Sequence, residues 1–230
     1  MTEIVQGTPD LERTFERFDN WIRLWRATDT RTATIESVMP EIVGEVPVTE
    51  REAIWNYEYS EEQILKSVVG TYHLAWSDFA DTMPATAQFV QDDLSALGLD
   101  HKTEGAAIDI EKSWVEAGKA HRVDEWHVDG ARQMPRGPIR GFVSYLVAAP
   151  EGTEYYVGSC EAQKFELRLM PGLENLLLLG PNMQTGSVEQ QKAWSIARID
   201  PMTIHRSPIM QQSAERLFMR ILVDITLSRN

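Results

Sequence analysis

The alternation of apolar and polar positions predicts that the second half of the chain is built from β-strands. Side chains point to opposite faces along a strand, so a period of two marks one buried face. Residues 215 to 223 show this period, and their apolar face consists of Leu217, Met219, Ile221 and Val223. Residues 139 to 149 are almost continuously apolar between two turn sequences, which predicts a second long strand. A shorter strand is expected from Thr153 to Gly158.

A longer period, of three to four residues, predicts helices in the first hundred residues. Apolar residues at positions 11, 15, 18 and 22 form one face of a helix over residues 10 to 22. A capping-box pattern, serine followed by glutamine three residues later, opens a second helix that is expected to cover residues 60 to 79. A third helix is expected over residues 86 to 97. Residues 29 to 50 contain two prolines and are expected to be irregular.

Length and composition are those of one enzyme-sized domain. The chain has 230 residues and 43% hydrophobic content, enough for a sizeable core, so we expect a single domain over residues 1–230. Its first part, residues 1–100, is expected to be mostly helical, and residues 105–228 are expected to form a β core. The single cysteine excludes an internal disulfide. We see no signal peptide and no membrane-spanning apolar stretch, and therefore expect a cytoplasmic protein without a membrane partner.

Two segments carry residue types that bind transition metals. His127 and Asp129 stand two positions apart, so on a strand they would share one face, and a turn residue, Gly130, follows at once. His205 comes much later in the chain and would have to lie on a neighbouring strand. Two histidines and one carboxylate form the facial triad that holds Fe(II) and leaves positions open for substrate chemistry. Taken singly, each histidine has an equally good interpretation as an ordinary core, surface or loop residue.

Two arginines occupy the second face of the predicted last strand. These are Arg216 and Arg220, with Phe218 between them. A buried guanidinium needs an anionic partner, and arginine binds a carboxylate through two parallel N–H bonds. The alternative is an exposed strand face with ordinary surface arginines.

The order of these motifs resembles that of the Fe(II)/2-oxoglutarate-dependent oxygenases. The motifs are W-H-x-D at 126–129, P-x-T-I-H-R-S-P at 201–208 and E-R-L-F-M-R-I at 215–221. The resemblance implies a mainly β fold with N-terminal helices (α+β), in which a double-stranded β-helix, a jelly-roll or cupin-like core, packs against the helices. It extends over about half of the chain, from near residue 120 to 225.

The resemblance also implies a set of site residues. His127, Asp129 and His205 would be the catalytic iron ligands, and Arg216 would bind the far carboxylate of the cosubstrate 2-oxoglutarate, with Arg220 as the alternative. Tyr145, on the strand over residues 139 to 149, would be a further cosubstrate contact, although a half-buried strand aromatic is an equally good interpretation. A carboxylate at position 129 favours hydroxylation or a related oxidation by dioxygen over halogenation.

Three functions remain open from the sequence. The first is an oxygenase that acts on a small molecule, such as an amino acid or a specialised metabolite. The second is a protein or nucleic-acid hydroxylase of the same chemistry, and the net charge of −13 disfavours nucleic acid because an acidic surface repels phosphates. The third is a cupin-like metal-binding protein without oxygenase activity. The substrate, the position oxidised and the oligomeric state do not follow from the sequence.

Overall fold

The computed structural model describes most of the chain and shows a mainly β fold with several helices. The described residues are 11–27, 33–60, 74–122, 124–133, 139–166, 174–181 and 185–226. The helices are α1 (Leu11–Ala27), α2 (Val48–Trp55), α4 (Trp76–Thr82), α5 (Pro84–Ala96) and the short 3₁₀ helix η1 (Asp100–Gly105). In the described part, no helix is both long and apolar enough to cross a membrane.

The strands pair antiparallel in two sheets that share β5. The strands are β1 (Ala33–Ser37), β2 (Glu41–Glu45), β3 (Ala107–Val115), β4 (His127–Gln133), β5 (Ile139–Ala149), β6 (Glu154–Glu166), β7 (Glu174–Pro181), β8 (Ser187–Gln190), β9 (Ser195–Ile199), β10 (His205–Arg206) and β11 (Ala214–Asp224). One sheet runs β3-β11-β5-β9-β2. The other joins β1, β6, β10 and β4, with β7 and β8 also paired to its strands. The start of β5 pairs with the end of β4, so the sheets are continuous there.

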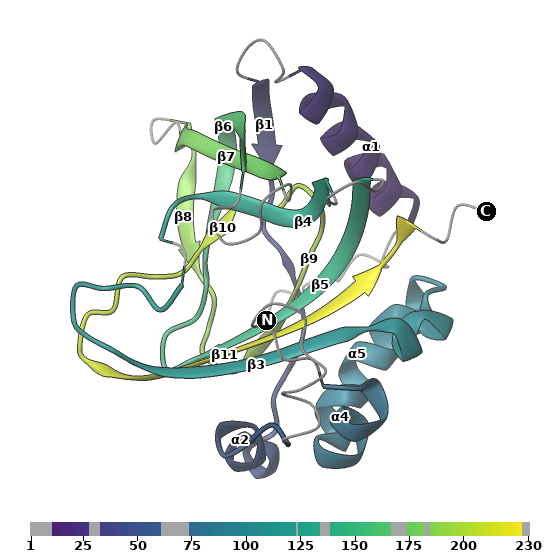
Figure 1. The fold of residues 1–230 in the computed structure, drawn as a ribbon, viewed down its shortest axis with the longest axis vertical. Helices are drawn as coiled ribbons and strands as arrows, with labels where there is room; N and C mark the ends of the chain where they lie inside the picture. Colours follow the sequence, from purple (N-terminus) through teal and green to yellow (C-terminus); the bar gives the residue numbers. More distant parts are fainter. Residues whose placement is uncertain are drawn as a thin grey trace, which may run out of the picture.

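The sheet that contains β11 has two different faces. On one face, the four alternating apolar residues of β11 join the large hydrophobic core that also contains Phe79, Val90 and Leu94 of the helices. Figure 1 shows α4 and α5 on the side of this sheet that faces away from β4, β6 and β7. The opposite face meets the second sheet in a smaller cluster, here called the interior cluster. Its members are Leu146, Ala148, Tyr155, Ala197, Ile199 and Phe218.

Strand prediction from the hydrophobic pattern is confirmed in the second half of the chain. The strand expected over 139 to 149 is β5, and the strand expected over 215 to 223 is β11 with one more residue at each end. The short strand expected from Thr153 is β6, which continues to Glu166. The core side of β11 is buried as the alternation predicted.

Prediction in the first half is right for two helices and wrong for two other segments. The helix expected over 10 to 22 is α1, and the helix expected over 86 to 97 is α5. The second helix was expected to run to Phe79, and residues 61–73 of it lie outside the described part. Leu74 pairs with Ile108 in a β-bridge, so α4 starts separately at Trp76. The expectation of irregular structure over 29 to 50 is wrong, because β1, β2 and the start of α2 lie there.

A carboxylate outside α5 holds the start of this helix. The first N–H groups of a helix have no partner within the helix, and the residue before α5 provides no side-chain cap. Glu50 of α2 accepts from the N–H groups of Ala85 and Thr86, at 2.7 and 2.9 Å, and from the Thr86 hydroxyl at 2.6 Å. This contact ties α5 to the segment that follows β2, and so fixes the sheet edge near the candidate site.

Candidate functional site

His127 and His205 are direct neighbours across two strands. In the antiparallel register of β4 and β10, His205 stands opposite His127. Their ring centroids are 4.6 Å apart and the ring planes are inclined at 54°. His205 is buried, whereas His127 is partly exposed. The structure thus brings together two of the three residues that the sequence proposed as metal ligands.

Hydrogen bonds to the backbone fix the tautomer of both rings. The Nδ1 atom of His127 lies 2.8 Å from the carbonyl oxygen of Glu125, and that of His205 lies 3.1 Å from the carbonyl oxygen of Thr203. A carbonyl oxygen only accepts, so each Nδ1 must carry the proton. In that tautomer the Nε2 atom carries the lone pair with which imidazole binds a metal. Because both rings present the Nε2 lone pair, they are a chemically suitable pair of metal ligands.

Contacts beside the two histidines hold their strands in place. The guanidinium of Arg206, next to His205, lies over the ring of Trp126, next to His127, at 4.3 Å from the ring centroid. The same guanidinium donates to Glu154 of β6 at 2.7 Å. Because β10 is only two residues long, these contacts add to the few ladder hydrogen bonds that fix its register.

Asp129, the third proposed ligand, lies two residues beyond His127 on β4. Its side chain is outside the described part of the structure, so its role as a ligand stays a prediction. Among the side chains that are described, no group of three metal-binding residues is close enough to hold a metal ion. The expectation of a turn at Gly130 is wrong, because β4 continues through it to Gln133.

Arg216 is almost completely buried and has neutral partners. Its exposed fraction is 1%. The Nε atom donates to the carbonyl oxygen of Glu151 at 3.3 Å, and Nη1 donates to the Ser207 hydroxyl at 3.2 Å and to Nδ1 of His121 at 3.4 Å. The buried Nη2 atom has no hydrogen-bond partner within the described residues. Burial lowers the pKa of Arg216 to about 10, so it is still a cation at neutral pH.

The imidazole of His121 is neutral beside this cation. Burial, and then the charges of Arg216 and Arg122, lower the pKa of His121 to about 4. Its Nδ1 atom can therefore accept from Arg216, which leaves the proton on Nε2. Ser207 connects the arginine to the histidine pair, because it stands two residues after His205. At about 3.3 Å per extended residue, their Cα atoms are roughly 7 Å apart.

Arg220 lies on the same face of β11 as Arg216 but has its own carboxylate. Its Nη2 atom donates to Asp109 of β3 at 2.9 Å, and both side chains are buried. Arg220 stands opposite Asp109 in the strand register, so this pair is part of the sheet itself. An internal ion pair of this kind makes Arg220 a poorer candidate for binding an outside carboxylate.

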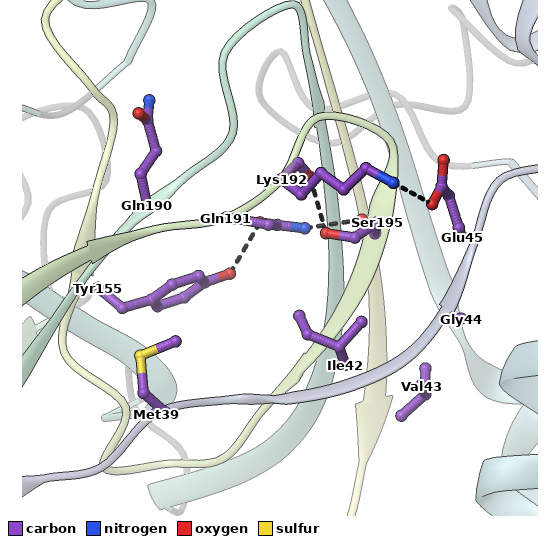
Figure 2. Close-up of a pocket in the computed structure, with 10 residues that line it drawn as sticks. All are labelled: Met39, Ile42, Val43, Gly44, Glu45, Tyr155, Gln190, Gln191, Lys192 and Ser195. Carbon is purple, nitrogen blue, oxygen red and sulfur yellow. Dashed lines mark hydrogen bonds and ion pairs between the residues drawn. The ribbon is translucent and has the colours of Figure 1, made fainter. Parts of the chain in front are cut away.

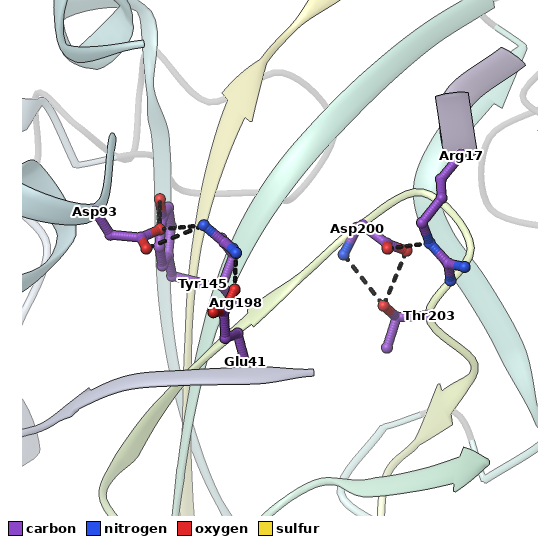
Figure 3. Close-up of polar contacts among 7 residues, drawn as sticks. All are labelled: Arg17, Glu41, Asp93, Tyr145, Arg198, Asp200 and Thr203. Carbon is purple, nitrogen blue, oxygen red and sulfur yellow. Dashed lines mark hydrogen bonds and ion pairs between the residues drawn. The ribbon is translucent and has the colours of Figure 1, made fainter. Parts of the chain in front are cut away.

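The structure does not bring Tyr145 to the two histidines. Tyr145 belongs to the large core on the helix side of β5, and its hydroxyl donates to Asp93 of α5 at 2.8 Å. Burial raises the pKa of Tyr145 well above its ordinary value, so the hydroxyl stays protonated. Figure 3 shows this contact together with Arg198, which also reaches Asp93 and Glu41. We therefore leave Tyr145 out of the proposed site.

A pocket of about 460 Å³ opens next to the interior cluster. Tyr155 belongs to both, and its ring centroid is 6.4 Å from that of His205. Figure 2 shows the residues that line the pocket, which come from β2 and Met39 just before it, from Tyr155 of β6, and from the segment between Gln190 and Ser195. The pocket has the size of a small-molecule site.

Three residues of this region were not foreseen from the sequence. His121, Ser207 and Tyr155 have no motif of their own, and the spacing of His121 from His127 fits no metal site. A weak signal existed for Ser207, because it lies in the same short segment as His205. Nothing local signals His121, which lies 95 positions before its partner Arg216.

Comparisons with known proteins find solved structures that are similar at low sequence identity. No family model and no curated protein matches the sequence. A crystal structure of EvdO2 from Micromonospora carbonacea var. aurantiaca is similar, with 12% sequence identity, a TM-score of 0.44 and coverage of 89% of this chain and 90% of the other. A structure of EvdO2 complexed with 2-oxoglutarate is similar at 10% identity and a TM-score of 0.42, with the same coverage.

Proposed function

We propose that this protein is an Fe(II)- and 2-oxoglutarate-dependent oxygenase that oxidises a small molecule, with its two sheets forming a double-stranded β-helix. One observation carries the proposal: a buried arginine that has only neutral hydrogen-bond partners donates to Ser207, which stands two residues after His205 of the histidine pair. The motif order in the sequence supports the same conclusion. The pocket beside Tyr155 favours a small-molecule substrate over a macromolecule.

The residues present fit a divalent iron. His127 and His205 would bind it through Nε2, since each Nδ1 proton is directed to a carbonyl oxygen, and Asp129 would supply the carboxylate. Fe(II) with 2-oxoglutarate supplies the activation of dioxygen, in which the cosubstrate becomes succinate and carbon dioxide while a substrate C–H bond becomes C–OH. The protein contributes position and surroundings rather than this chemistry.

Arg216 and its neighbours fit the far carboxylate of the cosubstrate. The Nη2 donor is buried, and an anion that accepts from it would remove an unfavourable unpaired group. The Ser207 hydroxyl lies beside the same guanidinium and can turn to donate to the anion. A dicarboxylate held here would reach toward the histidine pair, because Ser207 and His205 are two residues apart.

The surroundings hold the Arg216 guanidinium in one orientation and away from solvent. The guanidinium of Arg216 is fixed by a backbone carbonyl, a hydroxyl and a neutral imidazole, so its orientation is set before any ligand arrives. Preorganised donors in a site that excludes water bind charge more strongly than donors exposed to water.

Anaerobic titration of the apoprotein with Fe(II), followed by 2-oxoglutarate, tests the proposal. We expect a visible metal-to-ligand charge-transfer band that needs both additions. His127→Ala should abolish the band by weakening iron binding. Arg216→Ala should retain iron binding and lose the band at cosubstrate concentrations that saturate the wild type. Thermal unfolding of each variant checks that the fold survives.

Two results would contradict the proposal. Iron binding without a band in the wild type would favour a cupin-like metal-binding protein. A band that is unchanged in Arg216→Ala would show that the buried arginine does not bind the cosubstrate.

A further inference from the structure

The pocket beside Tyr155 has a floor whose polar groups are bonded to one another. The Tyr155 hydroxyl donates to Oε1 of Gln191 at 3.0 Å. The Nε2 atom of Gln191 donates to the carbonyl oxygens of Leu146 and Ser195, at 3.0 and 2.7 Å. The Ser195 hydroxyl donates to the carbonyl oxygen of Lys192 at 2.7 Å. Figure 2 shows these bonds, except the one to Leu146, as dashed lines.

This floor therefore suits an apolar group. A polar ligand group would have to displace an internal hydrogen bond in a buried position, and that exchange brings little gain. Tyr155 and Gln191 are both buried, so their arrangement is fixed by packing as well as by hydrogen bonds.

Apolar side chains continue from the floor to the mouth of the pocket. Met39 and Ile42 line it and remain exposed, at 42% and 41%. Ile42 of β2 stands opposite Ala197 of β9, which belongs to the interior cluster. The exposed apolar side chains at the mouth thus lie beside the interior cluster, to which Tyr155 also belongs. Large apolar side chains left exposed at a concave surface are typical of a ligand site.

A cation stands at the rim and can be released to a ligand. Lys192 donates to Oε2 of Glu45 at 2.6 Å, and its side chain is 74% exposed. Glu45 has a second cationic partner, because Arg51 donates to its Oε1 atom at 2.7 Å. An incoming anion could therefore take Lys192 while Arg51 still compensates Glu45. An exposed ion pair is weak enough for this exchange.

We propose that this pocket binds the substrate of the oxygenase, and that the substrate is an amphipathic anion with an aryl or branched-alkyl body. The apolar body lies on Met39, Ile42 and the Tyr155 ring, and the anionic end binds Lys192 at the rim. Because Tyr155 packs near His205, the inner end of the body lies closest to the iron ligands and is the part that is oxidised. The assignment as substrate rests on the proposed function, whereas the binding site itself does not.

Fluorescence titration with 1-anilinonaphthalene-8-sulfonate tests the site, because this probe combines an aryl body with an anionic group. We expect one saturable site in the wild type, without any need for iron or 2-oxoglutarate. Ile42→Asp should weaken binding by about tenfold or more, since a charge replaces an apolar contact of the pocket. Val48→Asp is the matched control, because Val48 is 74% exposed and does not line the pocket. Lys192→Met should weaken binding by roughly threefold.

Competition distinguishes the class of ligand. 4-Phenylbutyrate should displace the probe, its neutral amide should do so less well, and glucose should not displace it. Equal binding to the Ile42→Asp and Val48→Asp variants, or equal competition by glucose, would overturn the proposal. Probe binding at this site without a charge-transfer band would retain the pocket and reject the oxygenase, and a band without probe binding would do the reverse.

Discussion

Two regions of this protein shield an arginine from most of the solvent, and they surround its charge in different ways. Arg198 of β9 binds the carboxylates of Asp93 and Glu41, which come from a helix and from the neighbouring strand (Figure 3). Arg216 of β11 has a carbonyl oxygen, a hydroxyl and a neutral imidazole as its partners. In the first region, carboxylates of the protein itself balance the charge of the arginine. The second has a buried cation whose charge is matched by no ion pair within the described residues.

The difference separates structural charges from a charge available to a ligand. Burying a cation costs several kcal/mol unless a partner compensates it. Arg220, four residues from Arg216 on the same strand, has such a partner in Asp109. Among the described residues, Arg198 and Arg220 form ion pairs with carboxylates, whereas Arg216 has only the Coulombic attraction of Glu151 without an ion pair. This difference is consistent with an anion from outside.

The largest expected effect comes from breaking the ion pair between Arg220 and Asp109. Asp109→Asn removes, at almost constant volume, the negative charge with which the buried guanidinium of Arg220 forms an ion pair. We expect a loss of about 3–5 kcal/mol in the free energy of unfolding, measured by denaturant titration. Glu36→Gln, at an exposed position on β1, is the control for removing one carboxylate. A loss below about 1 kcal/mol would mean that Arg220 does not depend on Asp109.

Arg216→Met should preserve stability but weaken the binding of 2-oxoglutarate. The variant removes a buried charge that forms no ion pair within the described residues, so we expect unchanged or higher stability, by up to about 2 kcal/mol. Affinity for 2-oxoglutarate should fall on the order of 100-fold, because the charge-assisted donors are lost. Saturating cosubstrate should raise the unfolding temperature of the iron-loaded wild type but not of the variant. Equal stabilisation of both proteins would place the cosubstrate elsewhere.

His121 offers a finer test of the same site. His121→Leu removes the acceptor for Nη1 of Arg216, so the guanidinium can rotate. We expect about tenfold weaker 2-oxoglutarate binding with unchanged iron affinity, measured by calorimetry under anaerobic conditions. His121→Asn returns an acceptor near the position of Nδ1 and should recover part of the loss. If both variants bind the cosubstrate equally, orientation of Arg216 by the imidazole is unimportant.

The smallest expected effect is the dependence of stability on pH. The pKa of His121 is about 4 in the folded protein, against about 6.5 in an unfolded chain. The unfolded state therefore binds more protons between these values, and this residue makes stability fall as the pH drops from 7 toward 4. We expect on the order of 1 kcal/mol between pH 7 and pH 5, because the ring is partly solvent-exposed.

Comparison with His121→Asn isolates this contribution. The variant should lose that part of the pH dependence when both proteins are unfolded by denaturant at pH 7 and pH 5. Parallel curves for the two proteins would show that His121 titrates normally in the folded state.

The sequence by itself determined the elements whose signal is local. The period of two in β11 comes from residues within one strand, and each apolar position faces the core whatever the partner strand is. Local patterns also predicted that His127 and Asp129 lie on one strand, which is β4. The turn sequences at both ends of residues 139 to 149 predicted the long strand β5. The roles of the two histidines and the aspartate as iron ligands stay a prediction.

Two features could not be predicted because they depend on distant parts of the chain: the short strands β1 and β2, and the face of β5 on which Tyr145 lies. β1 and β2 are five residues each, and their partners are residues 158–162 of β6 and 195–198 of β9. Five residues beside prolines carry too little pattern to identify a strand without its partner. β5 is buried on both faces for most of its length, so its pattern did not reveal that Tyr145 faces the helices.

Only the tertiary structure decided what surrounds Arg216. The strand carries two similar arginines, and nothing local distinguishes them. The register of β3 against β11 places Asp109 opposite Arg220 and Ser113 opposite Arg216, while the chain folds His121 and Ser207 against the Arg216 guanidinium. Sequence patterns report burial, because hydrophobic periodicity is a property of one segment. The compensation of a charge depends on which groups meet in space, and contacts between segments distant along the chain decide that.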